Sequence, residues 1–184
     1  MKIANKKTVF EGRHLKVIEK HITNMQGVNS IWETIERKNI HGCGAVVIIA
    51  LTKNKELIFE KNWRAPLESF VIQFPAGLTD IPRENEEQAA RRELLEETGY
   101  EANKLIPVIL SPLAPALTAT RARHFFAPDV EFKGKTGNKD VEEIEVSKIP
   151  IEQVDDFLLN PPAGVELDLR VPGILWVMKN KGLI

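Results

Sequence analysis

Cysteine is nearly absent from this sequence, which has Cys43 as its only one among 184 residues. A single cysteine cannot form an intramolecular disulfide, and it cannot supply the several thiolates of a zinc or iron–sulfur centre. The four histidines are scattered and no HExxH motif is present, which disfavours a zinc hydrolase. Because Cys43 directly precedes an apolar run, we expect it to be an inert core residue of a protein from a reducing compartment.

The chain also lacks an excess of charge of one sign and any long hydrophobic run. Its formal net charge is -1, and its lysines and arginines form no basic stripe of the kind that tracks nucleic-acid phosphates. No apolar segment is long enough to span a bilayer, and residues 1–10 are polar and basic, unlike a signal peptide. We therefore expect a soluble, cytoplasmic protein with neither a nucleic-acid nor a membrane partner.

The amino-acid composition suits a protein with one hydrophobic core, since 43% of the residues are hydrophobic and 28% are charged. The interleaving of strand-like and helix-like segments predicts an α/β architecture, with a mixed sheet flanked by helices. The patterns predict strands at residues 16–22, 31–36, 44–51, 56–60, 70–74, 105–110, 122–127 and 143–146, and helices at 85–98, 151–159 and 172–179.

The helix predicted at residues 85–98 is unusually acidic. Six glutamates and two arginines stand between Glu84 and Glu97. Glu93 and Glu97 are four residues apart and Glu96 is three from Glu93, so these three carboxylates share about one helical face, where like charges destabilise one another. A hard divalent cation such as Mg²⁺ or Mn²⁺ would resolve this repulsion. A solvated surface helix is the alternative, and composition alone favours it.

A wider sequence pattern favours the cation-binding helix over the solvated surface helix. Gly77, Glu84 and the segment RELLEETGY (residues 92–100) resemble the Nudix box, in which a glycine, a glutamate and an REUxEExGU segment (U is apolar) stand at set spacings. Six residues separate Gly77 from Glu84, where the family has five. We expect the loop at 78–83, which contains Asp80 and Pro82, to absorb the additional residue.

The resemblance implies a fold and a domain organisation. It implies a Nudix α/β/α sandwich with a mixed sheet, plus a small N-terminal β-sheet. Residues 1–41 would form an N-terminal β region that serves dimerisation and substrate binding, and residues 42–184 would form the catalytic domain.

The resemblance also implies a magnesium-dependent site, with Mn²⁺ as a possible substitute. Glu93 and Glu97 would be the principal metal ligands, joined by Glu96 and by the Ala76 carbonyl. Arg92 would orient the glutamates through a charge-assisted hydrogen bond. Metal ions at these ligands would neutralise a pyrophosphate and activate water.

Within the family, the chain resembles most closely the ADP-ribose and nucleoside diphosphate sugar pyrophosphatases. Residues 74–78 (FPAGL) match the segment before the box, and residues 62–64 (NWR) resemble a Gln-aromatic-Arg strand end. This implies cleavage of ADP-ribose or a related compound into a nucleoside monophosphate and a sugar phosphate. A GDP-sugar, flavin or dinucleotide substrate stays open, as does a non-catalytic nucleotide sensor, although the intact box glutamates argue against a sensor.

Four residues are candidates for substrate binding. The resemblance implies that Trp32 stacks on adenine and Glu33 bonds to the base, in the active site of the neighbouring subunit of a homodimer. Packing within the sheet is an equal alternative for Trp32. Arg64 suits a phosphate clamp, with a surface ion pair as the alternative. Pro115 stands where ADP-ribose pyrophosphatases carry a proline.

The general base is expected from the segment EEIEV (residues 142–146), which resembles a glutamate-bearing loop before a late strand in this branch. Glu142 is the first choice and Glu143 the second. Arg121, Arg123 and His124 could contact a terminal phosphate or ribose, but alternate positions on a strand that faces water explain them more simply.

Overall fold

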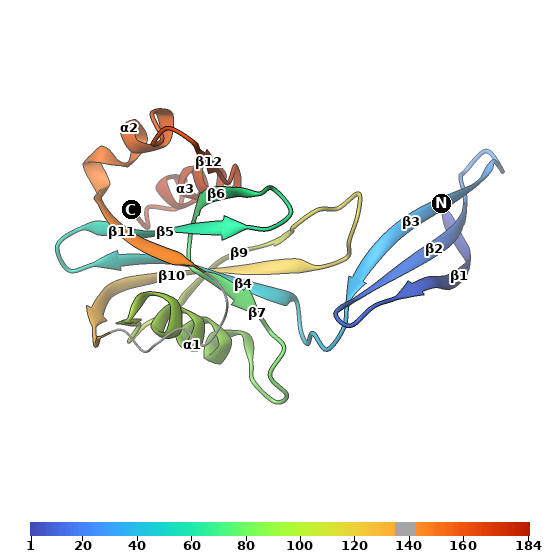
Figure 1. Cartoon of the computed structure of the whole chain (residues 1–184), viewed down its shortest axis with the longest axis horizontal. Helices are drawn as coiled ribbons and strands as arrows, with labels where there is room; N and C mark the ends of the chain where they lie inside the picture. The colour runs from blue at the N-terminus through green and yellow to red at the C-terminus, as the bar shows by residue number, and fades with distance from the viewer. Residues whose placement is uncertain (135–142) are drawn as a thin grey trace.

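A separate three-stranded sheet forms the N-terminal part of the protein. The computed structural model describes residues 1–134 and 143–184. Strands β1 (Lys2–Glu11), β2 (Leu15–Thr23) and β3 (Asn29–Arg37) pair antiparallel in sequence order and stand to one side of the main body (Figure 1). The sequence predicted β2 and β3. It did not predict β1, whose residues include three lysines and are all exposed, so the strand has no buried face.

The body contains a nine-stranded mixed sheet within the described residues. The path β12-β6-β5-β4-β10-β8 runs through it, with β11 on β5, β7 on β4 and β9 on β10. The parallel pairs are β4–β10 and β6–β12. The strands are β4 (Gly44–Thr52), β5 (Glu56–Arg64), β6 (Ser69–Gln73), β7 (Ala76–Leu78), β8 (Tyr100–Glu101), β9 (Ile106–Pro112), β10 (Arg121–Phe132), β11 (Ile144–Pro150) and β12 (Val165–Leu167).

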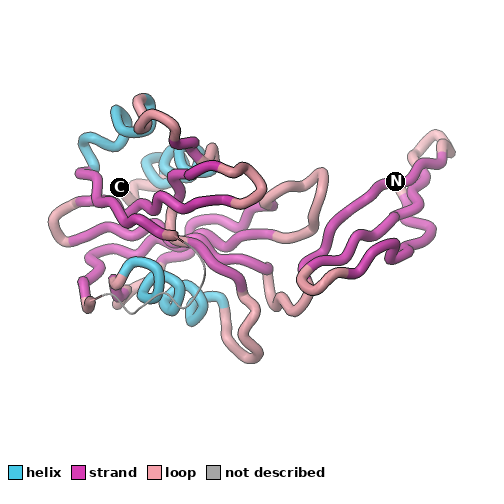
Figure 2. The backbone as a smooth tube through the Cα atoms, in the orientation of Figure 1, coloured by secondary structure: helices cyan, strands magenta, loops and turns pink. Residues whose placement is uncertain are grey.

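Helices cover the sheet from two sides, which confirms the predicted α/β/α sandwich (Figures 1 and 2). They are α1 (Glu86–Thr98), the 3-10 turn η1 (Ile151–Gln153), α2 (Val154–Leu159) and α3 (Arg170–Asn180). None of the helices in the described parts of the chain has both the length and the apolar character needed to cross a membrane.

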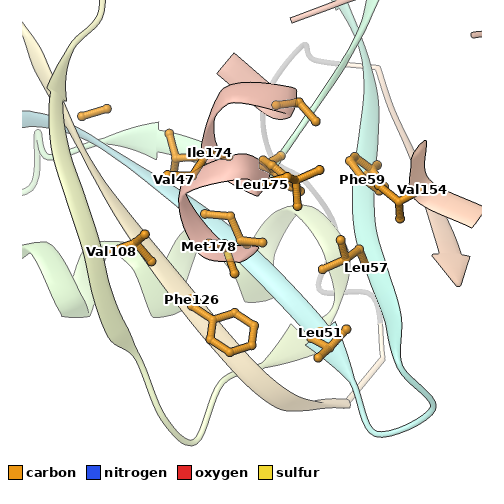
Figure 3. Close-up of a cluster of buried hydrophobic side chains, with 14 of the residues drawn as sticks. Val47, Leu51, Leu57, Phe59, Val108, Phe126, Val154, Ile174, Leu175 and Met178 are labelled. Carbon is orange, nitrogen blue, oxygen red and sulfur yellow. The ribbon is translucent and has the colours of Figure 1, made fainter. Parts of the chain in front are cut away.

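Two hydrophobic clusters fill the spaces between the sheet and the helices. In one, Ile174, Leu175 and Met178 of α3 pack with residues of β4 and β5 such as Val47 and Phe59 (Figure 3). In the other, α1 packs through small residues against the alternate side chains of β4 and β10. Because side chains alternate along a strand, β4 and β10 each contribute residues to both clusters.

Helix α1 has the ends that its sequence predicts. The Asn85 side chain accepts a hydrogen bond from the Gln88 N–H, and the Gln88 side chain accepts one from the Asn85 N–H, each at 2.9 Å, which forms a capping box. Gly99 ends the helix with φ of 75°, the left-handed region that favours glycine. Ala89 and Ala90 are fully buried, and their small size lets α1 lie close to the sheet.

Candidate active site

Arg92 is the centre of an ion-pair network on α1. Its Nε and Nη2 donate to the two carboxylate oxygens of Glu84 at 2.9 and 3.0 Å, and its Nη1 donates to Glu93 at 2.8 Å and to Glu96 at 3.3 Å. The hydrogen bonds with Glu84 are the main cause of a raised Arg92 pKa, against the effect of burial. Glu84 therefore meets Arg92 in a two-pronged contact despite the additional residue in the preceding loop.

Glu93 lies directly against Gly77 of β7. A Cβ added at Gly77 would stand 2.0 Å from Cδ of Glu93, so only glycine leaves room for the carboxylate. The Glu93 side chain is 14% exposed, and burial raises its pKa more than neighbouring Arg92 lowers it. The glycine of the box thus has a steric role: it lets the helix present Glu93 at the backbone of β7.

Glu97 accepts a hydrogen bond from the residue that precedes Gly77 in β7. The Ala76 N–H donates to Oε2 of Glu97 at 3.1 Å. Burial raises the Glu97 pKa, and neighbouring Glu60 of β5 raises it further through its charge and a shared hydrogen bond. Glu60 is fully buried. Two acids thus meet in a buried space where only one of them ionises easily.

The sequence did not predict Glu60 as a site residue. Its signal was an alternation in β5, where Glu60, Asn62 and Arg64 occupy every second position of a strand that also contains the apolar run at residues 57–59. Glu60 and Asn62 are both fully buried. A buried strand with polar residues on one face indicates a polar site beneath that face.

The carboxylates have the chemistry of a divalent-cation site, although they do not form a closed ligand cage. Carboxylate and carbonyl oxygens are the donors that Mg²⁺ prefers. Among the described residues, no three carboxylate, imidazole or thiol groups are already arranged to hold an ion. Glu96 is 52% exposed, whereas Glu93 and Glu97 are directed toward β7. The buried pair therefore forms the inner part of the group, and Glu96 lies at its surface.

Arg64 lies at a polar pocket formed with the C-terminal segment. The Gln73 side-chain oxygen accepts hydrogen bonds from Nε and Nη2 of Arg64 at 3.1 and 2.7 Å. Gln73, His124, Asp168 and Arg170 line a cavity together with Arg64. A buried amide oxygen thus helps to orient the Arg64 guanidinium.

The prediction that His124 faces water is wrong. His124 is 3% exposed, and burial lowers its pKa. Its neighbours on β10 differ from it: Arg121 is exposed, and Arg123 donates to Glu86 at 3.0 Å. Because alternate residues of a strand point to opposite faces, His124 enters the space between the sheet and α3, where the cavity lies.

Trp32 lies in the N-terminal sheet, beside the β9–β10 connection. Its Nε1–H donates to the Ala116 carbonyl at 2.8 Å, one residue beyond Pro115. Trp32 is 45% exposed, and Glu33 is exposed as well. Within one chain, strand β3, which carries Trp32 and Glu33, stands apart from α1 (Figure 1).

The predicted general base, Glu142, lies outside the described residues. Glu143, the second choice, is exposed and directly precedes β11. Strand β11 begins with Ile144 opposite Asn62. The chain therefore enters β11 next to the polar face of β5.

Comparisons with known proteins agree with this geometry. The sequence profile of the NUDIX domain matches residues 43–167. The chain is 30% identical over 148 residues to ADP-ribose pyrophosphatase of Bacillus subtilis (strain 168), covering 80% of this chain and 77% of that protein. It is 28% identical over 159 residues to ADP compounds hydrolase NudE of Escherichia coli (strain K12), covering 86% and 82%.

The fold has a solved counterpart. A crystal structure of an ADP compounds hydrolase superposes with a TM-score of 0.81 at 24% identity, and the match covers 100% of this chain and 96% of that one. The match includes the N-terminal sheet as well as the body.

Proposed function

The chain belongs to the NUDIX domain family and is a hydrolase of that family, and we propose that it cleaves the pyrophosphate of ADP-ribose or of a related nucleoside diphosphate sugar. The products would be a nucleoside monophosphate and a sugar phosphate. The observation that carries the proposal is the placement of Glu93 and Glu97 against Gly77 and Ala76 of β7, with Arg92 linking Glu93 to Glu84. The names of the two similar bacterial proteins support the substrate class.

We propose Mg²⁺ as the cofactor, with Mn²⁺ as a substitute. Glu93, Glu97 and the Ala76 carbonyl would hold it, and Glu96 would join them from the surface. Buried Glu60 beside Glu97 adds a further carboxylate to the donor set. A bound divalent cation supplies positive charge to the pyrophosphate and lowers the pKa of water. The raised pKa values of Glu93 and Glu97 fit this role, because a cation would stabilise the charged forms that burial opposes.

The remaining steps need groups that orient and move protons. Arg92 keeps Glu84 and Glu93 in fixed positions through its planar fork. Arg64 would hold a phosphate, since its guanidinium is oriented by Gln73. Glu142 would accept the proton of the attacking water, while the bond between phosphorus and the bridging oxygen breaks and that oxygen leaves with the other phosphate.

We also propose a homodimer in which the N-terminal sheet meets a second copy. Every residue of β1 is exposed, and Ile3, Phe10 and Ile31 leave large apolar side chains uncovered on the same small sheet. Trp32 would then stack on the adenine in the partner's active site, with Glu33 bonding to the base and Pro115 nearby. Light scattering would show a dimer, and a monomer at micromolar concentration would remove this part of the proposal.

The substrate assignment is tested with a panel of compounds. Purified protein with Mg²⁺ would be given ADP-ribose, other ADP-sugars, a GDP-sugar, a flavin dinucleotide and a diadenosine compound, and released mononucleotide would be quantified. We expect the highest kcat/KM with ADP-ribose or another ADP-sugar. Preference for a GDP-sugar or a dinucleotide would overturn the substrate class, and binding without cleavage of any compound would indicate a sensor.

A further inference from the structure

Thr79 fastens the end of β7 to the segment that joins the N-terminal sheet to the body. It directly follows β7 and is 2% exposed. Its hydroxyl donates a hydrogen bond to the His41 carbonyl, and its carbonyl accepts one from the His41 N–H at 2.7 Å. Its N–H donates to the Gly44 carbonyl at 3.3 Å. The side chain and both backbone groups of this one residue therefore bind the same short segment.

The segment that receives Thr79, residues 41–44, is a tight turn. The Gly44 N–H donates to the His41 carbonyl at 3.1 Å, so this carbonyl accepts hydrogen bonds from both Gly44 and Thr79. Gly42 and Gly44 have φ of 56° and 104°, in the left-handed region that favours glycine. A Cβ at Gly44 would stand 2.7 Å from Cγ2 of Thr120, directly before β10. Because the turn is closed by its own hydrogen bond and packed against a neighbour, it offers Thr79 a fixed anchor.

The position of β7 relative to α1 has little tolerance. The Glu93 carboxylate fills the space beside Gly77, so the strand cannot come closer to the helix. The bond from the Ala76 N–H to Glu97 is 3.1 Å long, and a displacement of about 0.4 Å in the other direction would stretch it to about 3.5 Å, near the limit for a hydrogen bond. A strand of three residues needs an anchor at its end to keep its place this closely.

The anchor also separates β7 from the loop that follows. The loop at residues 78–83 is one residue longer than the Nudix box requires. Because Thr79 is fixed, the additional residue is accommodated at residues 80–83, beyond the anchor, and the strand is not displaced by it.

We propose that Thr79 is a positioning residue for the proposed hydrolysis: its hydroxyl holds β7 at the distance from α1 that Glu93 and Glu97 require. This inference rests on the proposed function, since the carboxylates that it serves are those of the proposed site. A buried threonine that only satisfied its own hydroxyl would contribute to the free energy of unfolding and would leave the bond between Ala76 and Glu97 unchanged. The two roles therefore differ in a measurable way.

The test combines amide hydrogen exchange of the metal-free protein, followed by NMR, with steady-state kinetics on ADP-ribose. Thr79→Val keeps the side-chain shape and both backbone hydrogen bonds but removes the hydroxyl. The Ala76 amide should exchange at least tenfold faster in this variant, and kcat should fall at least tenfold while KM changes less than threefold. Thr79→Ser should restore both values. Thr79→Cys, whose thiol is a weaker donor, should lie between the two, and it keeps the test decisive if Thr79→Val does not fold.

Thr52→Val is the matched control. Thr52 is 5% exposed, its hydroxyl bonds to Glu56 at 3.2 Å, and it ends β4 at the opposite end from the residues that pair with β7. This variant should unfold at a lower temperature and keep wild-type exchange at Ala76 and wild-type kcat. The same behaviour in the folded variants Thr79→Val and Thr79→Cys would overturn the inference. Exchange is measured without substrate, so it decides the role of Thr79 separately from the proposed hydrolysis, which fails if wild type does not cleave ADP-ribose.

Discussion

The backbone N–H of Ala76 donates a hydrogen bond to Oε2 of Glu97 at 3.1 Å, which ties β7 to the last turn of α1. One residue further along the strand, Gly77 leaves the space in which Glu93 stands. Two consecutive backbone positions thus set the places of two carboxylates that are one helical turn apart. The short strand β7 is therefore as much a part of the candidate active site as the acidic helix.

Substitution of Gly77 by alanine should damage this arrangement. The new Cβ would overlap the Glu93 carboxylate, so Glu93 or the strand must move. Because misplacement of a catalytic group by about 1 Å can cost a hundredfold in rate, we expect kcat/KM of Gly77→Ala to fall by about a hundredfold or more. Steady-state kinetics of mononucleotide release would measure the loss.

The control for this substitution is Gly173→Ala in α3. Apart from its chain neighbours and the helix backbone, no atom of the described residues lies within 4 Å of a Cβ at Gly173, and alanine is favoured over glycine in a helix by up to about 1 kcal/mol. This variant should keep wild-type kcat/KM and unfold at an equal or higher temperature. Wild-type activity in Gly77→Ala would show that the Glu93 position is not required for turnover.

Ionised Asp168 should stabilise the folded protein, and this stabilisation should be lost in acid. Burial raises its pKa, but the hydrogen bonds and charge of Arg170 outweigh burial, and the net pKa is lowered from 3.8. The folded state therefore favours the ionised form. This stabilisation is present above the unfolded pKa of 3.8 and is lost as pH falls through the lower folded pKa.

Asp168→Asn should accordingly unfold at a lower urea concentration than wild type at about pH 7, with the difference shrinking as pH falls below about 4. Asp155→Asn is the control, because Asp155 is 73% exposed and its pair with Lys179 is expected to contribute less than about 1 kcal/mol. A difference between Asp168→Asn and wild type that stays constant across this pH range would contradict the assignment.

Replacement of Glu142 tests the general base. We expect Glu142→Gln to lower kcat by about a hundredfold or more, as losses of a general base usually do. Glu143→Gln, the adjacent substitution, should change kcat by less than a few-fold. The reverse result would assign the role to Glu143, and small effects in both variants would move the base to another part of the chain.

Sequence signals that act within a few residues predicted the ends of α1 and the position of β4. Asn85 and Gly99 marked the ends of α1 because capping chemistry acts within a few residues. Strand β4 was predicted from its run of β-branched residues. Strand β1 was not, since it is stabilised by pairing with β2 rather than by a buried face of its own.

The site residues that the sequence did not predict are brought together by contacts between distant segments of the chain. Glu60 approaches Glu97 only because β5 and α1 pack together. Asp168 and Arg64 line the same pocket only because β12, in the C-terminal segment, pairs with β6. His124 was misplaced because a single polar residue on a strand does not reveal which face is buried. These relationships depend on sheet order, which a single sequence does not specify.

The proposed hydrolysis depends most on the inward-facing carboxylates of α1, so the deciding experiment replaces one of them. The measurement is Mg²⁺-dependent release of AMP from ADP-ribose by wild type, Glu97→Gln and Glu87→Gln. Glu87 is exposed on the same helix, so its substitution removes an equal charge outside the group. We predict wild-type rates for Glu87→Gln and a loss of at least a hundredfold for Glu97→Gln. Equal rates for Glu97→Gln and wild type, or no AMP released by wild type, would refute the proposed hydrolysis at these carboxylates.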